Sequence, residues 1–183
     1  MNILQTILIL AAAFLAVFVE ATFPVLRRWL GAQVDLLPVL MVYAALNLDV
    51  VGVALLAVLG GLWFDALSAN PLGITILPLF AIGFLIHLRR DLILRELSFA
   101  QLVLGTVASA VMPVLSVLLL LSAGKQPLLG WGSIWQWIVM AAGGAAATPL
   151  VFALFNWCNH ALGYQPRTET SFRPDREIRR GRL

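Results

Sequence analysis

Five polar side chains interrupt the strongly apolar stretches of this 183-residue sequence, and they are the residues best placed to do chemistry. They are Glu20, Asn47, Asp49, Asp65 and Asn156. A carboxylate inside a membrane segment is a candidate proton relay, ion site or substrate site, because burying it in hydrocarbon is costly. Together the five could line a polar cavity for a small molecule. The three carboxylates, however, fall near the ends of the expected helices, where water or backbone N–H groups can satisfy them.

Asp65 has the most informative surroundings, because small residues share its face of the expected helix. Ala54, Ala57, Gly61, Asp65 and Ser68 are spaced by three or four residues, which places them on one helical face. Lipid favours larger side chains and disfavours a carboxylate. This face is therefore expected to pack against protein.

A helix start is expected shortly after Asp65. In the run Asn70-Pro71-Leu72-Gly73, Asn70 is expected to cap the next helix and Pro71 to take its first position. The free N–H groups of that helix would point toward Asp65, whose carboxylate could accept hydrogen bonds from them. We expect Asp65 to clamp this helical hairpin; a contact with a partner protein and a proton or substrate site are the alternatives. The candidate structural or partner-contact residues are Gly61, Asp65, Ser68, Asn70, Pro71 and Gly73.

The sequence carries no recognisable catalytic or metal-binding pattern. His87 and His160 stand alone and Cys158 is the single cysteine, so no histidine pair or cysteine cluster is available. Phosphate-binding loops, zinc-protease motifs and nucleophile elbows are also missing. We expect a protein that is not an enzyme and that needs no cofactor and no metal.

The composition indicates an integral membrane protein. Hydrophobic residues make up 61% of the chain and charged residues 11%, against about half and about a quarter in soluble domains. Residues 1–160 are expected to form an all-α, polytopic membrane bundle, followed by a basic cytoplasmic tail over residues 161–183. Six transmembrane helices are expected, near residues 3–26, 33–48, 50–67, 72–88, 99–122 and 134–157.

The second and third of these helices could instead be one helix over residues 36–64, which gives five spans. One helix would leave Asp49 near the bilayer centre at a cost of about 3 kcal/mol, so a turn at residues 47–49 is preferred. The positive-inside rule mildly favours the alternative. Six spans put nine basic residues in the cytoplasm and three outside, whereas five spans give eleven and one.

Arginines gather after the fourth expected helix and in the tail, on the side expected to be cytoplasmic. They include Arg89, Arg90, Arg173, Arg176, Arg179, Arg180 and Arg182. We expect them to lie on anionic lipid, where each basic residue contributes about 1 kcal/mol. Docking of a cytoplasmic partner is the alternative.

The run VDLLPVLMVYAALNLD, followed by GVALLAVLGGLWFDALSANPLG, resembles the bacterial rod shape-determining MreD family. The resemblance covers residues 35–90 and lies in a Gly-rich helix ending in Gly61-x-x-x-Asp65 and a short loop ending in Leu72-Gly73. It implies a multi-pass inner-membrane protein that binds MreC and acts in cell elongation with MreB, RodA and a class B penicillin-binding transpeptidase. It also implies a fold similar to the six-helix substrate-binding subunits of energy-coupling-factor transporters, with no catalytic residues.

Two functions are therefore expected as alternatives. The first is a non-catalytic scaffold for peptidoglycan synthesis and cell shape, which binds MreC and membrane lipids but no nucleic acid. The second is a small-molecule binding subunit of a membrane transporter, built around the five polar residues named first.

Overall fold

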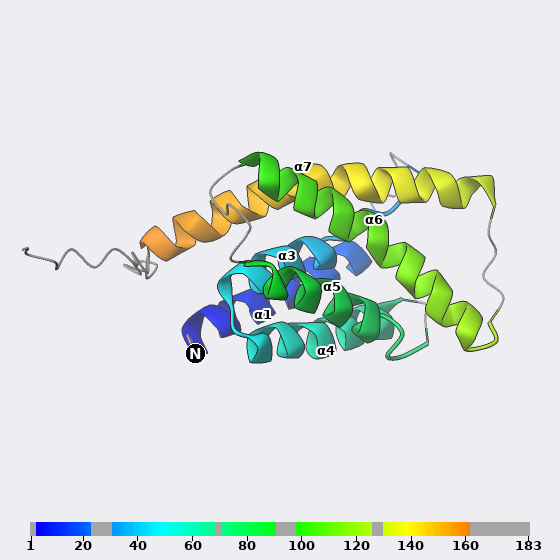
Figure 1. The fold of residues 1–183 in the computed structure, drawn as a ribbon, viewed down its shortest axis with the longest axis horizontal. Coiled ribbons are helices and arrows are strands. Elements are labelled where there is room, and N and C mark those ends of the chain that lie inside the picture. The colour runs from blue at the N-terminus through cyan, green and yellow to red at the C-terminus, as the bar shows by residue number, and fades with distance from the viewer. Residues whose placement is uncertain (1–2, 23–30, 69–70, 91–97, 126–129, 162–183) are drawn as a thin grey trace, which may run out of the picture.

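A computed structural model describes residues 3–22, 31–68, 71–90, 98–125 and 130–161. These residues form six α-helices and no strand (Figure 1). The helices are α1 (Ile3–Thr22), α3 (Leu37–Asn47), α4 (Val50–Leu67), α5 (Ile76–Leu88), α6 (Ser98–Ser122) and α7 (Trp131–Ala161). The predicted all-α class is confirmed for this part of the chain.

Four of the helices are long and apolar enough to cross a membrane, namely α1, α4, α6 and α7. The other two are short: α3 has 11 residues and α5 has 13. At about 1.5 Å per residue they measure roughly 17 and 20 Å, against about 30 Å for a bilayer core. The chain is therefore a helical membrane protein in which two helices are too short to span an ordinary bilayer alone.

The break between α3 and α4 falls where the sequence predicted it. α3 ends at Asn47, Leu48 has an extended backbone, and Asp49 immediately precedes α4. Asp49 is exposed at this turn, so its charge avoids the interior of the bundle. The alternative of one helix over residues 36–64 is wrong.

Several predicted helix boundaries need correction. α3 begins at Leu37 rather than at residue 33, and α5 begins at Ile76 rather than at residue 72. Gly73 has a φ of 92°, a left-handed conformation that a helix interior does not accept. α7 is longer than the predicted range of 134–157, and the predicted extension of the first helix to residue 26 lies outside the described residues.

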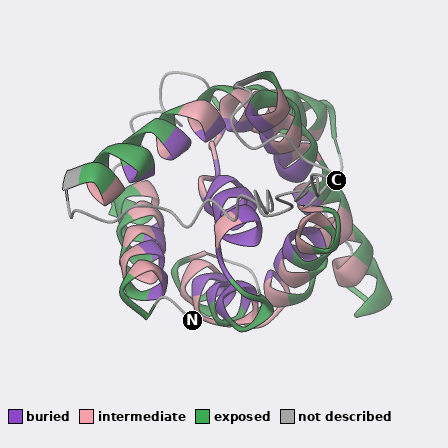
Figure 2. Cartoon of the chain, turned by 60° about the vertical axis from the view of Figure 1, so that its left-hand side comes forward, coloured by how far each residue is buried: buried purple, intermediate pink, exposed green. Residues whose placement is uncertain are grey.

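The short helix α3 is the centre of the bundle. Ten of its 11 residues are buried, and it contacts α1, α4, α5, α6 and α7. Figure 2 shows a buried helix surrounded by helices whose outer faces are exposed. A helix that is apolar all round needs such surroundings. Its Tyr43 ring stacks on Phe155 with centroids 4.4 Å apart and meets Phe152 edge-on at 4.9 Å.

Successive helices alternate in direction, so their ends gather at two ends of the bundle (Figure 1). One end holds the start of α1, the break after Asn47, Arg89, Arg90 and the end of α7; we call it the basic end. The other holds the ends of α1 and α4 and the starts of α3 and α5. We call it the acidic end, because Glu20, Asp35 and Asp65 lie there.

Small residues let α6 and α7 cross closely. Gly105 and Ser109 of α6 face Gly144 and Thr148 of α7: a Cβ atom on Gly105 would lie 2.6 Å from the Gly144 carbonyl oxygen, and one on Gly144 would lie 2.9 Å from the Gly105 carbonyl oxygen. Each helix thus carries a pair of small residues four apart, a spacing that favours close helix packing in membranes.

Candidate functional site

Asp65 is a buried hydrogen-bond acceptor in the last turn of α4, and its side chain is 2% exposed. Its Oδ2 atom accepts the backbone N–H of Gly73 at 2.8 Å and that of Thr75 at 3.1 Å. Its Oδ1 atom accepts the Thr75 hydroxyl. The prediction that the Asp65 carboxylate accepts hydrogen bonds from N–H groups at the start of the next helix is confirmed in part, because the donors lie just before that helix.

The donors differ from those that the sequence indicated. Thr75 precedes the first residue of α5, and Gly73 lies in the turn before it. Pro71 is exposed ahead of this turn, so the prediction that it occupies the first helical position is wrong. The predicted cap, Asn70, lies outside the described residues.

The small face of α4 is buried at Ala57, Gly61 and Asp65, as predicted, whereas Ala54 and Ser68 are only partly buried. A Cβ atom on Gly61 would lie 3.1 Å from the backbone nitrogen of Ile76. Gly61 therefore allows the start of α5 to lie directly against α4, one turn before Asp65. Ser68 closes α4, because its N–H donates to the Asp65 carbonyl oxygen at 3.3 Å.

A second acidic site, which the sequence analysis missed, lies at the start of α3. Glu20 Oε1 accepts the N–H of Leu36 at 2.7 Å, and Asp35 Oδ1 accepts the N–H of Leu37 at 2.8 Å. The two carboxyl groups thus bind consecutive N–H groups at the positive end of the α3 dipole. No sequence pattern joins them, since Glu20 belongs to α1 and Asp35 to the segment before α3.

Asp35 lies outside the helices but inside the protein. Its side chain is 4% exposed. Burial raises the pKa of Asp35 to about 6, and the hydrogen bond from Leu37 partly opposes this increase. Asp35 therefore favours its protonated form more strongly than a carboxyl group in water does.

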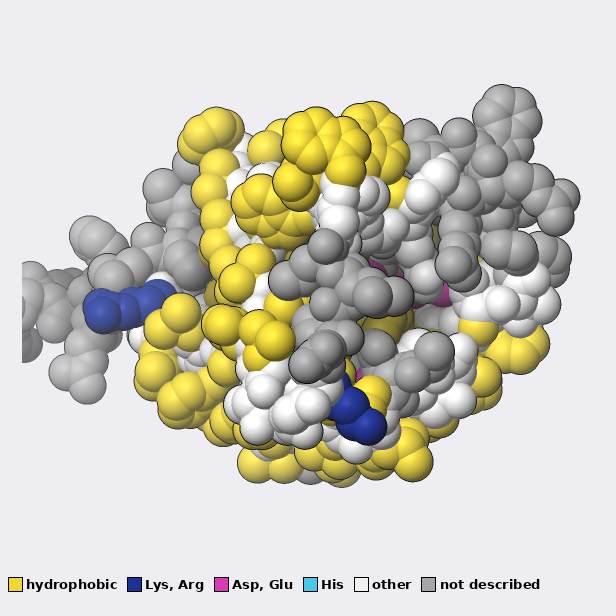
Figure 3. All heavy atoms as spheres, turned by 90° about the vertical axis from the view of Figure 1, so that its right-hand side faces the viewer, with side chains coloured by type: hydrophobic (Ala, Val, Ile, Leu, Met, Phe, Trp, Pro, Cys, Tyr) yellow, Lys and Arg dark blue, Asp and Glu magenta, His cyan; other side chains and the backbone are white. Residues whose placement is uncertain are grey.

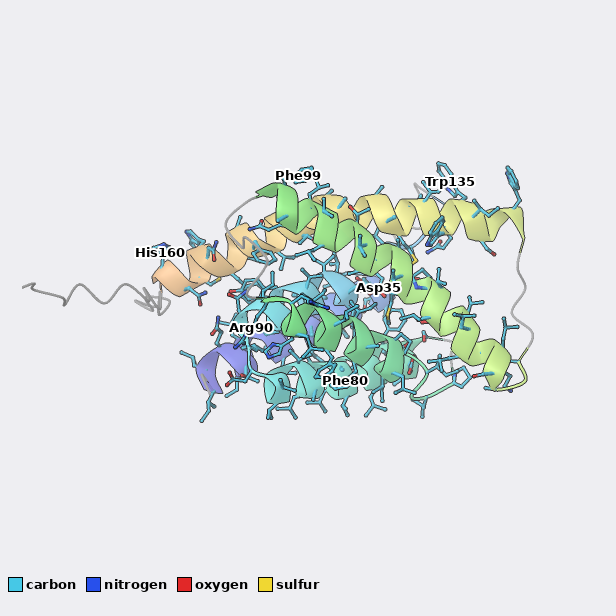
Figure 4. The ribbon with its side chains drawn as sticks, in the orientation of Figure 1. Asp35, Phe80, Arg90, Phe99, Trp135 and His160 are labelled. Atoms are coloured by element: carbon cyan, nitrogen blue, oxygen red, sulfur yellow. The ribbon has the colours of Figure 1, made fainter. Side chains whose placement is uncertain are left out.

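The acidic side chains lie at this end of the bundle. Figure 3 views this end and shows parts of acidic side chains between other atoms. Figure 4 places Asp35 within the bundle, with Trp135 pointing outward from α7 and with Arg90 and His160 at the opposite end. Gln136 of α7 holds the segment before α3 two residues ahead of Asp35. Its side chain accepts from the Gln33 N–H at 3.0 Å and donates to the Gln33 carbonyl oxygen at 2.8 Å.

The five polar residues that could have lined one cavity, in the alternative function, do not come together. Glu20 and Asp65 lie at the acidic end, whereas Asn47, Asp49 and Asn156 lie at or near the basic end. Asn47 Nδ2 donates to the carbonyl oxygen of Tyr43 within its own helix.

Other side chains brace the end of α3. His87 Nδ1 lies 3.0 Å from the carbonyl oxygen of Ala45, and Asn159 Nδ2 donates to the Tyr43 hydroxyl at 3.3 Å. Arg89 and Arg90 lie nearby, after α5. The predicted arginines at 173, 176, 179, 180 and 182 lie outside the described residues. Within the part of the chain that the structure describes, no group of three His, Cys, Asp or Glu side chains could hold a metal ion.

The fold and these sites define a helical membrane protein whose buried acids anchor the starts of two short helices. Comparisons with protein-family models, curated proteins and solved structures find no match to this chain.

Proposed function

We propose that this chain is a non-catalytic component of the bacterial cell-elongation complex, which scaffolds peptidoglycan synthesis by binding MreC. One observation carries the proposal: the stretch that resembles the MreD family, residues 35–90, contains α3, α4 and α5. These helices include the buried centre of the bundle, and the residues that carry the resemblance, Gly61 and Asp65, join α4 to α5. The resemblance therefore falls on the residues that determine the packing.

The hydrogen bonds of Asp65 are consistent with a scaffolding role. Both of its oxygen atoms accept hydrogen bonds from the turn before α5. A carboxylate committed in this way holds two helices in a fixed relation, which is what a partner-binding surface needs. RodA, the class B penicillin-binding transpeptidase and MreB are the further partners we propose, together with membrane lipids.

The proposed orientation places the basic end in the cytoplasm. Arg89 and Arg90 lie there with the end of α7, from which the arginine-rich tail continues, as the positive-inside rule favours. The chain then crosses the inner membrane six times with a cytoplasmic C-terminus, and α3 and α5 complete their crossings through local thinning of the bilayer. The similarity to energy-coupling-factor subunits rests on the family resemblance alone.

Depletion in a rod-shaped bacterium tests this proposal. Loss of the chain is expected to produce round cells, and re-expression of the wild-type chain to restore rods. Cells that keep their shape after complete depletion would contradict the proposal. A chain truncated after Tyr164 tests the tail separately: normal insertion without restored shape would favour partner docking over lipid binding.

A small-molecule binding subunit is the second candidate, because Glu20 and Asp35 place two carboxyl groups side by side at the acidic end. This function predicts a positively charged molecule retained through purification, and substitution of either acid would release it. The scaffold function predicts instead that MreC is retained through purification.

A further inference from the structure

We propose that Glu20 and Asp35 hold one proton between them, and that this proton keeps the end of α1 attached to the start of α3. The site is separate from Asp65, and it requires neither MreC nor a transported molecule. Its consequence is a link between pH and the packing of the first helix.

The hydrogen bonds bring the two carboxyl groups together. Glu20 binds the N–H of Leu36, and Asp35 binds the N–H of the next residue, Leu37. Two carboxylates that share one buried site do not both ionise readily, because like charges repel and each loses its hydration. Such a pair takes up protons as one coupled unit.

The second oxygen of Glu20 points to the same conclusion. Glu20 Oε2 is buried and has no hydrogen-bond partner. A buried anionic oxygen without a donor is strongly unfavourable. A proton on one of the two carboxyl groups removes one charge and supplies an O–H donor for the other.

Among the residues that the structure describes, the helices supply no basic side chain that could compensate the pair. The described residues of α1, α3, α4, α5, α6 and α7 contain no lysine or arginine. From α4, Asp65 is acidic and is already bound to Gly73 and Thr75; from α7, Gln136 is neutral and is bound to Gln33. Lys125 follows α6, Arg89 and Arg90 lie at the basic end, and Arg27 and Arg28 lie outside the described residues.

Loss of the proton would weaken the attachment of α1 to α3. Two adjacent negative charges would then compete for the N–H groups of Leu36 and Leu37, and their repulsion would push Glu20 away. The Leu36 N–H at the start of α3 donates to Glu20 of α1 at 2.7 Å. If this hydrogen bond is lost, the end of α1 would be released as the pH rises.

Infrared spectroscopy of the full-length protein in lipid nanodiscs tests for the proton directly. The wild-type protein is expected to show the carbonyl band of a protonated carboxylic acid near neutral pH. Asp35→Asn and Glu20→Gln are each expected to remove this band or to lower its pH midpoint by about one unit or more. Asp65→Asn is the matched control and is expected to leave the band unchanged. A wild-type protein without the band near neutral pH, or a band that neither variant alters, would overturn the proposal.

Hydrogen exchange tests the mechanical consequence in the same samples. After correction for the intrinsic effect of pH, protection of the Leu36 and Leu37 amides is expected to fall in the wild-type protein above the midpoint of the band. In Glu20→Gln the neutral side chain can still accept the hydrogen bond from the Leu36 N–H. Protection of the Leu36 and Leu37 amides is therefore expected to persist at high pH in this variant. If amide protection does not change while the infrared band titrates, the link between the proton and the packing of α1 is excluded. If Glu20→Gln is less stable than the wild type at high pH, a positive group must balance an ionised Glu20, and the proposal of a shared proton is wrong.

Discussion

The Asp65 carboxyl group accepts hydrogen bonds from both the backbone N–H and the side-chain hydroxyl of Thr75. One side chain at the end of α4 thus fixes the residue immediately before α5. Gly73, whose backbone is in the left-handed conformation, lies in the turn between α4 and α5. Its N–H donates to the same carboxyl group at 2.8 Å. The Asp65 side chain therefore joins the end of α4 to the start of α5.

Replacing Asp65 separates hydrogen bonding from charge. Asp65→Asn keeps one oxygen acceptor for the two N–H groups, so it is expected to lower the free energy of unfolding by only about 1 kcal/mol. Asp65→Leu leaves three buried donors without an acceptor and is expected to cost about 3 kcal/mol or more. Thermal unfolding of the two variants in the same detergent measures the difference. Equal losses would show that the negative charge, and not the acceptor, is what the hairpin needs.

Thr75 provides the complementary test from the donor side. Thr75→Val keeps the size of the side chain but removes the hydroxyl that donates to Asp65, and it is expected to cost about 1–3 kcal/mol because a buried carboxylate oxygen loses its partner. Thr75→Ser keeps the hydroxyl and is expected to stay closer to the wild-type stability. The order of the unfolding temperatures, wild type, then serine, then valine, checks this expectation. A serine variant as unstable as the valine variant would assign the effect to packing of the methyl group.

The features of the fold that the sequence predicted correctly are determined by residues that are close together in the sequence. The break at Asn47–Asp49 follows from the cost of burying one carboxylate, and the buried face of α4 follows from the spacing of Ala57, Gly61 and Asp65. The predicted start of the helix at residue 72 is too early, since α5 begins at Ile76. Pro71 and Gly73 favour a turn as readily as a helix start. Whether these residues form a turn or a helix start depends on the hydrogen bonds from the turn to Asp65, which are tertiary contacts.

The crossing of α6 and α7 is expected to be sensitive to one methyl group. Gly105→Ala would place its Cβ 2.6 Å from the Gly144 carbonyl oxygen, and the required shift of backbone is expected to cost about 1–3 kcal/mol. Gly132→Ala is the matched control, because nothing lies within 4 Å of its added Cβ. Gly132→Ala is expected to leave stability unchanged or to raise it slightly, since alanine favours helix. Comparable losses in both variants, measured by thermal unfolding, would contradict the close crossing.

The close crossing of α6 and α7 follows a pattern that is visible in the sequence. Gly105 and Ser109, and likewise Gly144 and Thr148, are small residues four apart, which is a recognised pattern for membrane helices. The pairing of Glu20 with Asp35 is different, because nothing in the spacing of the two acids indicates that α1 ends beside the start of α3.

The pKa of Asp35 predicts how stability changes with pH. Its pKa is about 6 in the folded protein against 3.8 for an unperturbed side chain, so between these values the folded state holds a proton that the unfolded state has lost. Stability is therefore expected to fall as the pH rises from about 4 through about 6. Asp35→Asn is expected to reduce this fall, which is on the order of 1–3 kcal/mol. Chemical unfolding at a series of pH values measures it, and an increase in stability over the same range would contradict the assignment.

Native mass spectrometry of the tagged, full-length chain, released gently from the membrane of a rod-shaped cell, tests the central claim most directly. The scaffold function predicts a complex whose mass equals the chain plus MreC, and this complex should persist in Asp65→Asn and weaken in Asp65→Leu as the α4–α5 hairpin loosens. A chain that never carries MreC, but instead carries a small molecule lost on substitution of Glu20 or Asp35, would contradict the scaffold and favour the binding subunit.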